Sequence, residues 1–239
     1  MTEKNIGTPG NSNELHEFPI EGGAITLHGI LSVPDRAHGL VILPRGIKVQ
    51  ESDTAQRRAV AQTSSFHQQG LATLLVDLFS SQEHDLDMQT GYFRDNIEVM
   101  QQRITSLAEW LSQYPRVQEL SIGLLGTGSI GTATLIIAAE RPDLIDAVVV
   151  AEGRFDLAKE SLPRITIPTL LIAPAQDSAA VQANQEALNL LTAEKALEQV
   201  GGVSSLFESD EGTKEMLRLA GQWFAGHLVT IPAADSQEL

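Results

Sequence analysis

The sequence predicts an α/β protein whose core is an open, mostly parallel β-sheet with helices on both faces. Short apolar runs alternate with amphipathic segments from about residue 40 onward, which is typical of parallel strands joined by crossover helices. Runs such as Leu40–Leu43 and Ala147–Ala151 are apolar at every position, the pattern of strands buried on both faces. A glycine-rich turn, Gly126 to Gly131, joins one such run to a helical segment, at the edge where open sheets bind ligands.

The first half of the chain is expected to form a hairpin, two buried strands and two helices. The hairpin turns at Glu21-Gly22-Gly23, and Pro44 ends the strand after it. A helix is expected from Asp53 to Gln69, with Asp53 as its cap and Gly70 as its stop, whereas the polar stretch Ser80 to Gly91 is expected to be a loop. The other segments are strands at His16–Ile20, Ala24–Val33, Leu40–Leu43 and Leu71–Val76, and a one-faced apolar helix over Asn96–Leu111.

The second half repeats a strand–helix unit three times and ends in one more strand and a long helix. The expected strands are Ile122–Leu125, Ala147–Ala151, Thr169–Ala173 and Ala196–Val200. Helices are expected from Gly131 to about Glu140, after Phe155, from Ala179 to Leu191, and around a final inner stripe of Met216, Leu219, Ala220, Trp223 and Phe224.

Length and composition indicate one globular domain at residues 14–230, with flexible tails at 1–13 and 231–239. The net charge of −15 disfavours binding to nucleic acid and to anionic membranes, and no apolar stretch is long enough for a membrane helix. The chain has no cysteine and no recognisable signal peptide, so the cytoplasm is the expected location. No cofactor and no metal are expected, because the histidines are scattered without ligand spacing.

The glycine-rich turn has one interpretation as a dinucleotide-binding loop. Gly126, Gly128 and Gly131 match the pattern G-x-G-x-x-G, and Glu152 lies 21 residues after Gly131 at the end of the next strand. In that motif a helix amino terminus binds the pyrophosphate and the carboxylate binds a ribose. The motif normally follows the first strand of its domain, however, whereas about four strands precede it here.

Several stretches between residues 38 and 228 resemble dienelactone-hydrolase-like α/β-hydrolases, particularly those attached to phosphoribosyltransferase domains. The stretches are Gly70–Leu75 with Asp77, Gly123–Gly126, Ala138–Asp143, Ala147–Val149, Arg154–Leu157, Pro168–Ile172 and Leu206–Glu208. The resemblance implies an α/β-hydrolase fold of about eight strands, with helices on both faces and no large cap. It also favours a second interpretation of the glycine turn, as the sharp turn that carries a nucleophilic serine in this family.

The resemblance assigns positions to the family's serine, histidine and aspartate, and two of the three are replaced. The serine position falls on Gly128, which has no side chain for attack, and the histidine position falls on Ser205, which is no base near neutral pH. The aspartate position falls on Asp177, which could equally cap the following helix. A shift of one residue would make Ser129 the nucleophile, but Ser129 is also interpretable as a first-turn or capping residue.

Other catalytic positions depart from the family as well. Where the family often has His-Gly, which helps to form the oxyanion hole, this chain has Pro44-Arg45-Gly46, and Lys48 would add further positive charge. His227 is expected to pack at the end of the last helix, and His84 is expected in a solvated loop near the same edge. The replacements therefore fall on catalytic positions while the framework segments persist.

Three functions remain open on this basis. The first is a non-catalytic α/β-hydrolase-fold protein that binds a small ligand or a protein partner. The second is an active ester or lactone hydrolase with Ser129 as nucleophile and Asp177 as acid, and the third is nucleotide or anion binding at the glycine turn. The residues expected to bind a ligand are Arg45, Gly126, Thr127, Gly128, Ser129, Glu152, Asp177 and Ser205.

Overall fold

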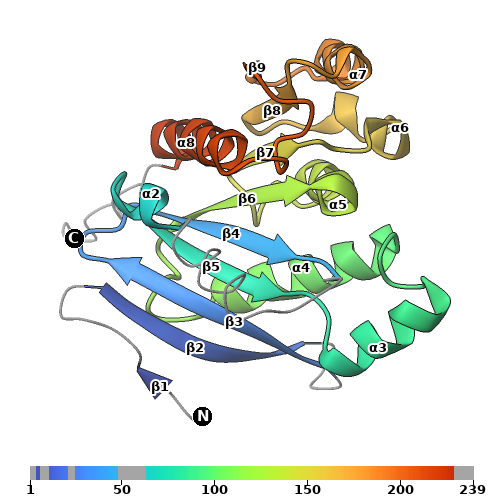
Figure 1. The fold of residues 1–239 in the computed structure, drawn as a ribbon. Helices are drawn as coiled ribbons and strands as arrows, with labels where there is room; N and C mark the ends of the chain where they lie inside the picture. Colours follow the sequence, from blue (N-terminus) through green and yellow to red (C-terminus); the bar gives the residue numbers. More distant parts are fainter. Residues whose placement is uncertain (1–3, 6–10, 21–24, 48–62, 229–239) are drawn as a thin grey trace.

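The computed structural model describes residues 4–5, 11–20, 25–47 and 63–228 of the chain. They contain one nine-stranded sheet in the order β1-β2-β3-β5-β4-β6-β7-β8-β9 (Figure 1). The strands are β1 (Lys4–Asn5), β2 (Asn11–Ile20), β3 (Ile25–Pro34), β4 (Gly39–Arg45), β5 (Leu71–Asp77), β6 (Ser121–Thr127), β7 (Ala147–Ala151), β8 (Thr169–Pro174) and β9 (Lys195–Val200).

Strand direction follows the connections. β2 and β3 are joined by a short connection and pair antiparallel from Asn11 opposite Pro34 to Ile20 opposite Ile25. β3 also pairs antiparallel with β5. The strands from β4 to β9 are connected through helices and pair parallel, so the ends of β4, β5, β6, β7 and β8 meet at one carboxyl edge.

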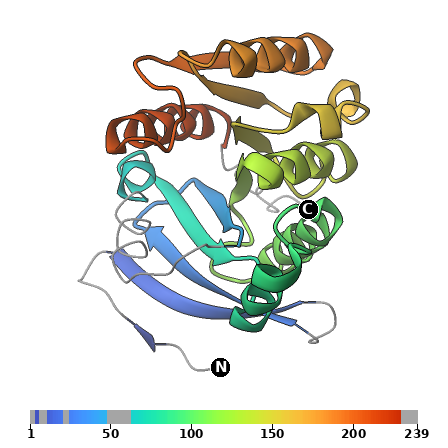
Figure 2. The same ribbon diagram turned by 45° about the vertical axis from the view of Figure 1, so that its right-hand side comes forward.

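Helices cover both faces of the sheet (Figures 1 and 2). They are α2 (Ser64–His67), α3 (Ser81–Thr90), α4 (Ile97–Leu111), α5 (Gly128–Glu140), α6 (Phe155–Ala158), the short 3-10 helix η2 (Leu162–Arg164), α7 (Ser178–Leu190) and α8 (Asp210–His227). Apolar residues of α4, α5, α6 and α7 form one core cluster with the sheet, and those of α2 and α8 form a second. Because successive side chains of a strand point to opposite faces, each buried strand contributes to both clusters.

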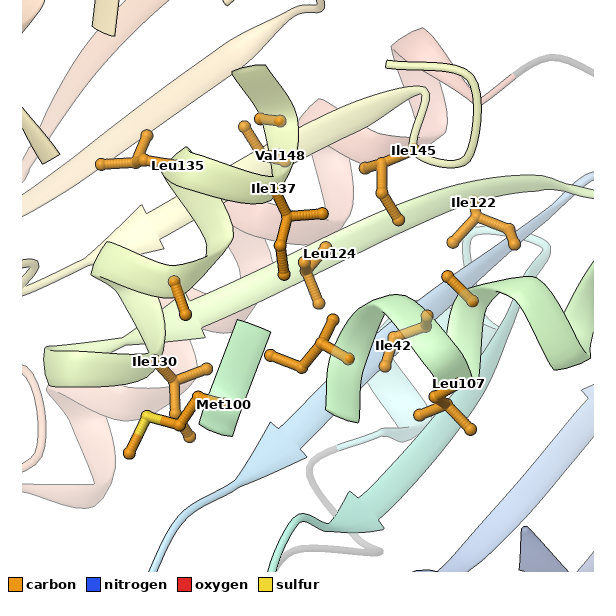
Figure 3. Packing of buried hydrophobic residues seen from close by; sticks show 14 of the residues in the cluster. Ile42, Met100, Leu107, Ile122, Leu124, Ile130, Leu135, Ile137, Ile145 and Val148 are labelled. Carbon is orange, nitrogen blue, oxygen red and sulfur yellow. The ribbon is translucent and has the colours of Figure 1, made fainter. Parts of the chain in front are cut away.

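The larger core lies between the α4–α5 pair and the centre of the sheet. Figure 3 shows Ile42 and Leu124 of the strands facing Met100 and Leu107 of α4 and Ile137 of α5. Leu107 and Leu124 are fully buried. Truncating a buried leucine to alanine typically destabilises a protein by about 2–5 kcal/mol, so this layer is a main source of stability.

On the other face, α8 packs closely on the sheet because two strand positions are glycine. A Cβ atom added to Gly123 would lie 2.6 Å from the Phe224 ring, and one added to Gly39 would lie 2.6 Å from Leu228 Cβ. Real Cβ contacts are never this short, so a side chain at either position would push α8 outward. The expected inner stripe of this helix is confirmed, since Met216, Ala220 and Phe224 are buried.

The expected strands are confirmed with small shifts at their ends, but three expectations need correction. The stretch Ser80 to Gly91 is helical, because Ser80 and Glu83 form a capping box that starts α3. α5 begins at Gly128, inside the glycine turn, rather than after Gly131. β2 begins at Asn11 and pairs with β1, so strands start within the stretch expected as a tail.

The helix expected from Asp53 to Gln69 is only partly covered by the structure. Asp53 lies outside the described residues, and helix α2 occupies Ser64–His67 in the described part. Gly70 follows with a φ of +74°, a conformation that favours glycine. No helix among the residues that the structure describes is long and apolar enough to cross a membrane.

Candidate functional site at the carboxyl edge

The turn from β6 to α5 places Gly128 at the centre of the carboxyl edge. Its backbone has a φ of +54°, in the left-handed region that side chains other than glycine seldom adopt. A Cβ atom added at Gly128 would meet no atom within 4 Å. The backbone conformation therefore restricts which residue types fit at position 128, whereas the surrounding space would accommodate a side chain.

The other two glycines of the turn are required by close packing. A Cβ atom added to Gly126 would lie 2.7 Å from the Gly131 Cα atom and 2.9 Å from the Ile130 carbonyl oxygen. One added to Gly131 would lie 2.8 Å from a methyl group of Val150 on β7. Both glycines let the first turn of α5 approach β6 and β7, which accounts for them without a bound phosphate.

Ser129 lies in the first turn of α5 and is engaged by a neighbouring carboxylate. Its hydroxyl donates a hydrogen bond of 2.6 Å to Oδ1 of Asp95, in the segment before α4. Thr127 is the N-cap residue of α5, and its side chain makes no capping bond. The Ser129 hydroxyl thus donates to a carboxylate rather than to an imidazole.

Arg45 and Asp77 form an ion pair at the ends of β4 and β5. The two residues are directly paired in the parallel register, and Arg45 Nη2 donates to Asp77 Oδ2 at 2.8 Å. Arg45 Nε is buried and has no hydrogen-bond partner in the described part of the chain. A Cβ atom added to the next residue, Gly46, would lie 3.5 Å from Ile130 Cδ1, so this strand end adjoins the first turn of α5. Lys48 lies outside the described residues.

Glu152, at the end of β7, ties this strand to the loop that precedes α8. It has a φ of +53°, unusual for a residue with a side chain, and its carboxylate accepts a hydrogen bond from the Leu206 backbone amide. Ser205 lies beside that contact, and its hydroxyl oxygen accepts a hydrogen bond of 3.3 Å from the Phe207 amide. The Glu152 carboxylate therefore binds a backbone amide of the protein itself. The dinucleotide interpretation requires the same carboxylate to bind a ribose.

Asp177 follows β8 and is the N-cap residue of α7. Its Oδ1 accepts a hydrogen bond of 3.0 Å from the Ala180 amide. Asp177 is interpreted either as a helix cap or as the family's catalytic acid, and this hydrogen bond shows that it caps α7. The cap uses only Oδ1 of Asp177. Oδ2 is not used in the cap, so capping does not exclude the role of the family's acid.

The two histidines singled out in the sequence both lie in helices. His227 ends α8, where Nδ1 lies 2.7 Å from the Trp223 carbonyl oxygen, and its ring packs 4.1 Å from the Trp223 ring. Its Nε2 lies 3.2 Å from Glu194 Oε1. The expected helix-end packing of His227 is thus observed, whereas His84 lies within helix α3 rather than in a loop.

Polar contacts near this edge also hold α3, and sequence reasoning missed them. The Arg103 guanidinium is almost fully buried, donates to Glu83 Oε2 at 3.0 Å and to the Leu78 carbonyl at 2.6 Å, and lies over the Phe79 ring. Burial raises the pKa of Glu83, but hydrogen bonds from Arg103 and Ser80 outweigh it and hold that pKa below its ordinary value. The signal available in the sequence was the Ser80–Glu83 capping-box spacing.

Comparisons with known proteins agree with this architecture. No protein-family model matches the chain. A curated relative from Mycobacterium tuberculosis, named "Putative phosphoribosyl transferase", is 31% identical over 212 residues, which are 89% of this chain and 46% of that protein. The chain thus spans about half the length of the curated relatives it matches.

Solved structures match over almost their whole length. The dienelactone hydrolase from Anabaena variabilis is 33% identical with a TM-score of 0.79, covering 90% of this chain and 99% of that one. Est1E from Butyrivibrio proteoclasticus has a TM-score of 0.66 at 16% identity, which shows a common fold. The chain therefore belongs to the dienelactone hydrolase family of α/β-hydrolases.

Proposed function

We propose that this protein is a non-hydrolytic member of its family that binds a small ligand at the carboxyl edge of the sheet. The observation that carries the proposal is the backbone at Gly128. Its positive φ and the open space around its Cβ direction suit the strained turn that presents a nucleophile, but glycine has no atom with which to attack. The turn would thus retain the shape of a catalytic site without its reactive group.

The neighbouring side chains support this proposal because none of them supplies the missing parts. Ser205, at the position assigned to the base, is a hydroxyl that accepts a backbone hydrogen bond. Ser129 donates to Asp95, a carboxylate, whereas activation of a serine normally needs an imidazole or a similar base. Asp177 remains as an acid, but an acid alone does not activate a nucleophile.

Restoring the two replaced positions tests the proposal. The wild-type protein is expected to hydrolyse p-nitrophenyl butyrate no faster than buffer and to take no label from a fluorophosphonate probe. The variant Gly128→Ser/Ser205→His should take the label and hydrolyse the ester at least about tenfold faster than wild type, because it regains a nucleophile and a base near Asp177. Labelling and initial rates measure both effects.

Two controls separate the alternatives. Adding Asp177→Ala to the restored variant should lower its rate, and Ser129→Ala in the wild-type background should change nothing. Stoichiometric labelling of the wild-type protein that disappears in Ser129→Ala would instead establish an active hydrolase. A folded double variant that takes no label would contradict the assignment of Gly128 to the nucleophile position.

A second candidate function is anion binding at the same turn. It is favoured by two sets of donors, the first-turn amides of α5, which Thr127 leaves without a side-chain cap, and the buried Nε of Arg45. Phosphate at matched ionic strength should then raise the melting temperature relative to chloride. Arg45→Gln should abolish that rise, whereas Asp77→Asn removes the same ion pair but keeps the donor and should preserve it.

Dinucleotide binding is not expected. Glu152 uses its carboxylate on the Leu206 amide, and close packing accounts for Gly126 and Gly131. NAD, NADP and ATP should therefore give no larger thermal shift than phosphate alone. A larger shift with NAD, lost in Glu152→Ala, would reverse this assignment.

A further inference from the structure

A cavity of about 580 Å³ opens between helices α6 and α7, and no residue of the Gly126–Gly131 turn lines it. One wall is the segment that follows β7, from Gly153 through α6 to Leu162, and the other is the second half of α7. None of the residues discussed above at the ends of β4, β6 and β8 lines it. Its volume falls within the range of sites that enclose small organic molecules.

The floor of the cavity is apolar and firmly held. Phe155, Leu162 and Ala187 line it, and each is at most 6% exposed, because each also belongs to the core beneath. Gly153 brings the wall close to the sheet, since a Cβ atom there would lie 2.6 Å from Val150 Cγ1. These three residues fix the base of the cavity, and exposed Ala183 and half-buried Leu190 provide apolar surface above it that an aryl or alkyl group could cover.

The rim carries two cations with unused hydrogen-bond donors. Arg154 makes a single long contact, 3.4 Å from Nη2 to Asp156 Oδ2, although a guanidinium has five N–H groups. Lys159 makes no hydrogen bond or ion pair with any residue in the described ranges. Two carboxylates share the rim, and neither of them is bonded to Lys159: Asp156 accepts from Arg154, and Glu186 accepts a 2.9 Å bond from Gln182.

We infer that this cavity binds a small carboxylate with an apolar body. The apolar body lies against Ala183, Leu190 and the edge of Phe155, and the carboxylate is bound by Lys159 and Arg154 at the rim. An apolar floor with a few polar groups at its edge is the usual composition of a small-molecule site. The inference is independent of whether the Gly128 turn is catalytic, binding or empty.

Titration of the 239-residue protein with phenylacetate, followed by amide NMR, tests the inference. Phenylacetate should shift the amides of residues 153–162 and 183–190 with a dissociation constant in the millimolar range or tighter, as its size allows. The neutral analogue 2-phenylethanol should bind more weakly. Lys159→Gln should weaken phenylacetate binding about two- to fivefold and reduce its salt dependence, since the contact is an exposed ion pair.

Two matched tryptophan variants localise the site. Ala183 lines the cavity and is exposed, so Ala183→Trp should fill the space without disturbing the core and abolish binding. Ala179 is exposed one turn earlier on α7 and does not line the cavity, so Ala179→Trp should bind as wild type does. Equal binding of 2-phenylethanol, shifts centred on residues 126–131, or unchanged binding in folded Ala183→Trp would each overturn the inference.

Discussion

Three glycines within six residues of the β6–α5 turn are needed for different physical reasons. Gly128 provides a positive φ in open space, whereas Gly126 and Gly131 allow backbone atoms to approach each other. Glu152 shows the opposite case, a side-chain residue held at positive φ, where a hydrogen bond to the Leu206 amide helps to offset a strain of about 1–3 kcal/mol.

The closest contact in the turn gives a prediction about stability. Gly126→Ala places a Cβ atom against the Thr134 hydroxyl oxygen and against backbone atoms of Gly131 and Ile130, and the backbone atoms can yield only if α5 moves. We expect a loss of about 1–3 kcal/mol in the free energy of unfolding, measured by urea denaturation. Gly201→Ala is the control, because a Cβ there meets nothing within 4 Å, and it should stay within about 0.5 kcal/mol of wild type. Equal effects of the two substitutions would contradict the packing explanation.

The sequence pattern could not separate these roles. A sequence pattern does not distinguish a glycine that lets a phosphate approach from one that lets another backbone segment approach. Both roles require only that the Cβ atom be absent. The position of Gly128 in the turn could be predicted from the resemblance. The hydrogen bond from Ser129 to Asp95, 34 residues earlier in the chain, could not be predicted. It depends on how α4 and α5 pack, and no local sequence pattern indicates it.

Helix α3 is held by polar contacts rather than by apolar burial. Asp87 is its only buried residue, while Leu86 and Met88 are 47% and 60% exposed. Burial raises the pKa of Asp87, but backbone hydrogen bonds from Arg94 and Phe93, together with the Arg94 charge, hold it below its ordinary value. The polar surface of this helix is why its sequence predicted a loop, since no apolar periodicity marks it.

These contacts predict that α3 opens on acidification before the sheet does. The folded-state pKa values of Glu83 and Asp87 lie below the ordinary values of 4.5 and 3.8. Their stabilisation is therefore complete above those ordinary values and is lost as the pH falls through the lowered ones. Hydrogen exchange between about pH 5 and pH 3 should show protection falling in α3 but not in β6.

A neutral variant provides the control for this titration. Asp87→Asn keeps an oxygen acceptor but removes the titrating charge, so α3 should be less protected at pH 6 and its protection should depend less on pH. Protection of α3 that falls equally steeply in Asp87→Asn would show that another group controls it. Arg103→Met should reduce the protection of α3 most at pH values above the ordinary pKa of Glu83, since it leaves the ionised carboxylate without its cation.

At the scale of the whole molecule, the sheet joins two separate apolar cores into one unit. Trp110 of α4 packs beside Phe18 at the first core, and Trp223 of α8 packs at the second, on the opposite face. Successive residues of each buried strand pack alternately into the first and the second core. Unfolding of one core would therefore expose strands whose other face belongs to the second core.

Residues 14–230 should therefore unfold as a single cooperative domain. We expect the variants Trp110→Phe and Trp223→Phe, each with one reporter tryptophan, to give the same urea midpoint once corrected for their own stability changes. Far-ultraviolet circular dichroism should give that midpoint as well. Two separate fluorescence midpoints would show that the α8 face opens independently of the α4–α5 face.

The sequence by itself determined most of the strands and helices and the family, and it assigned the catalytic positions on which the proposed function rests. These features depend on local apolar periodicity, on turn residues and on the identity of single positions such as Gly128 and Ser205. Only the tertiary structure decided which side chains at the carboxyl edge are already engaged. The bonds from Ser129 to Asp95, from Leu206 to Glu152 and from Arg45 to Asp77 join residues at least 32 positions apart, and the packing of whole elements brings them together.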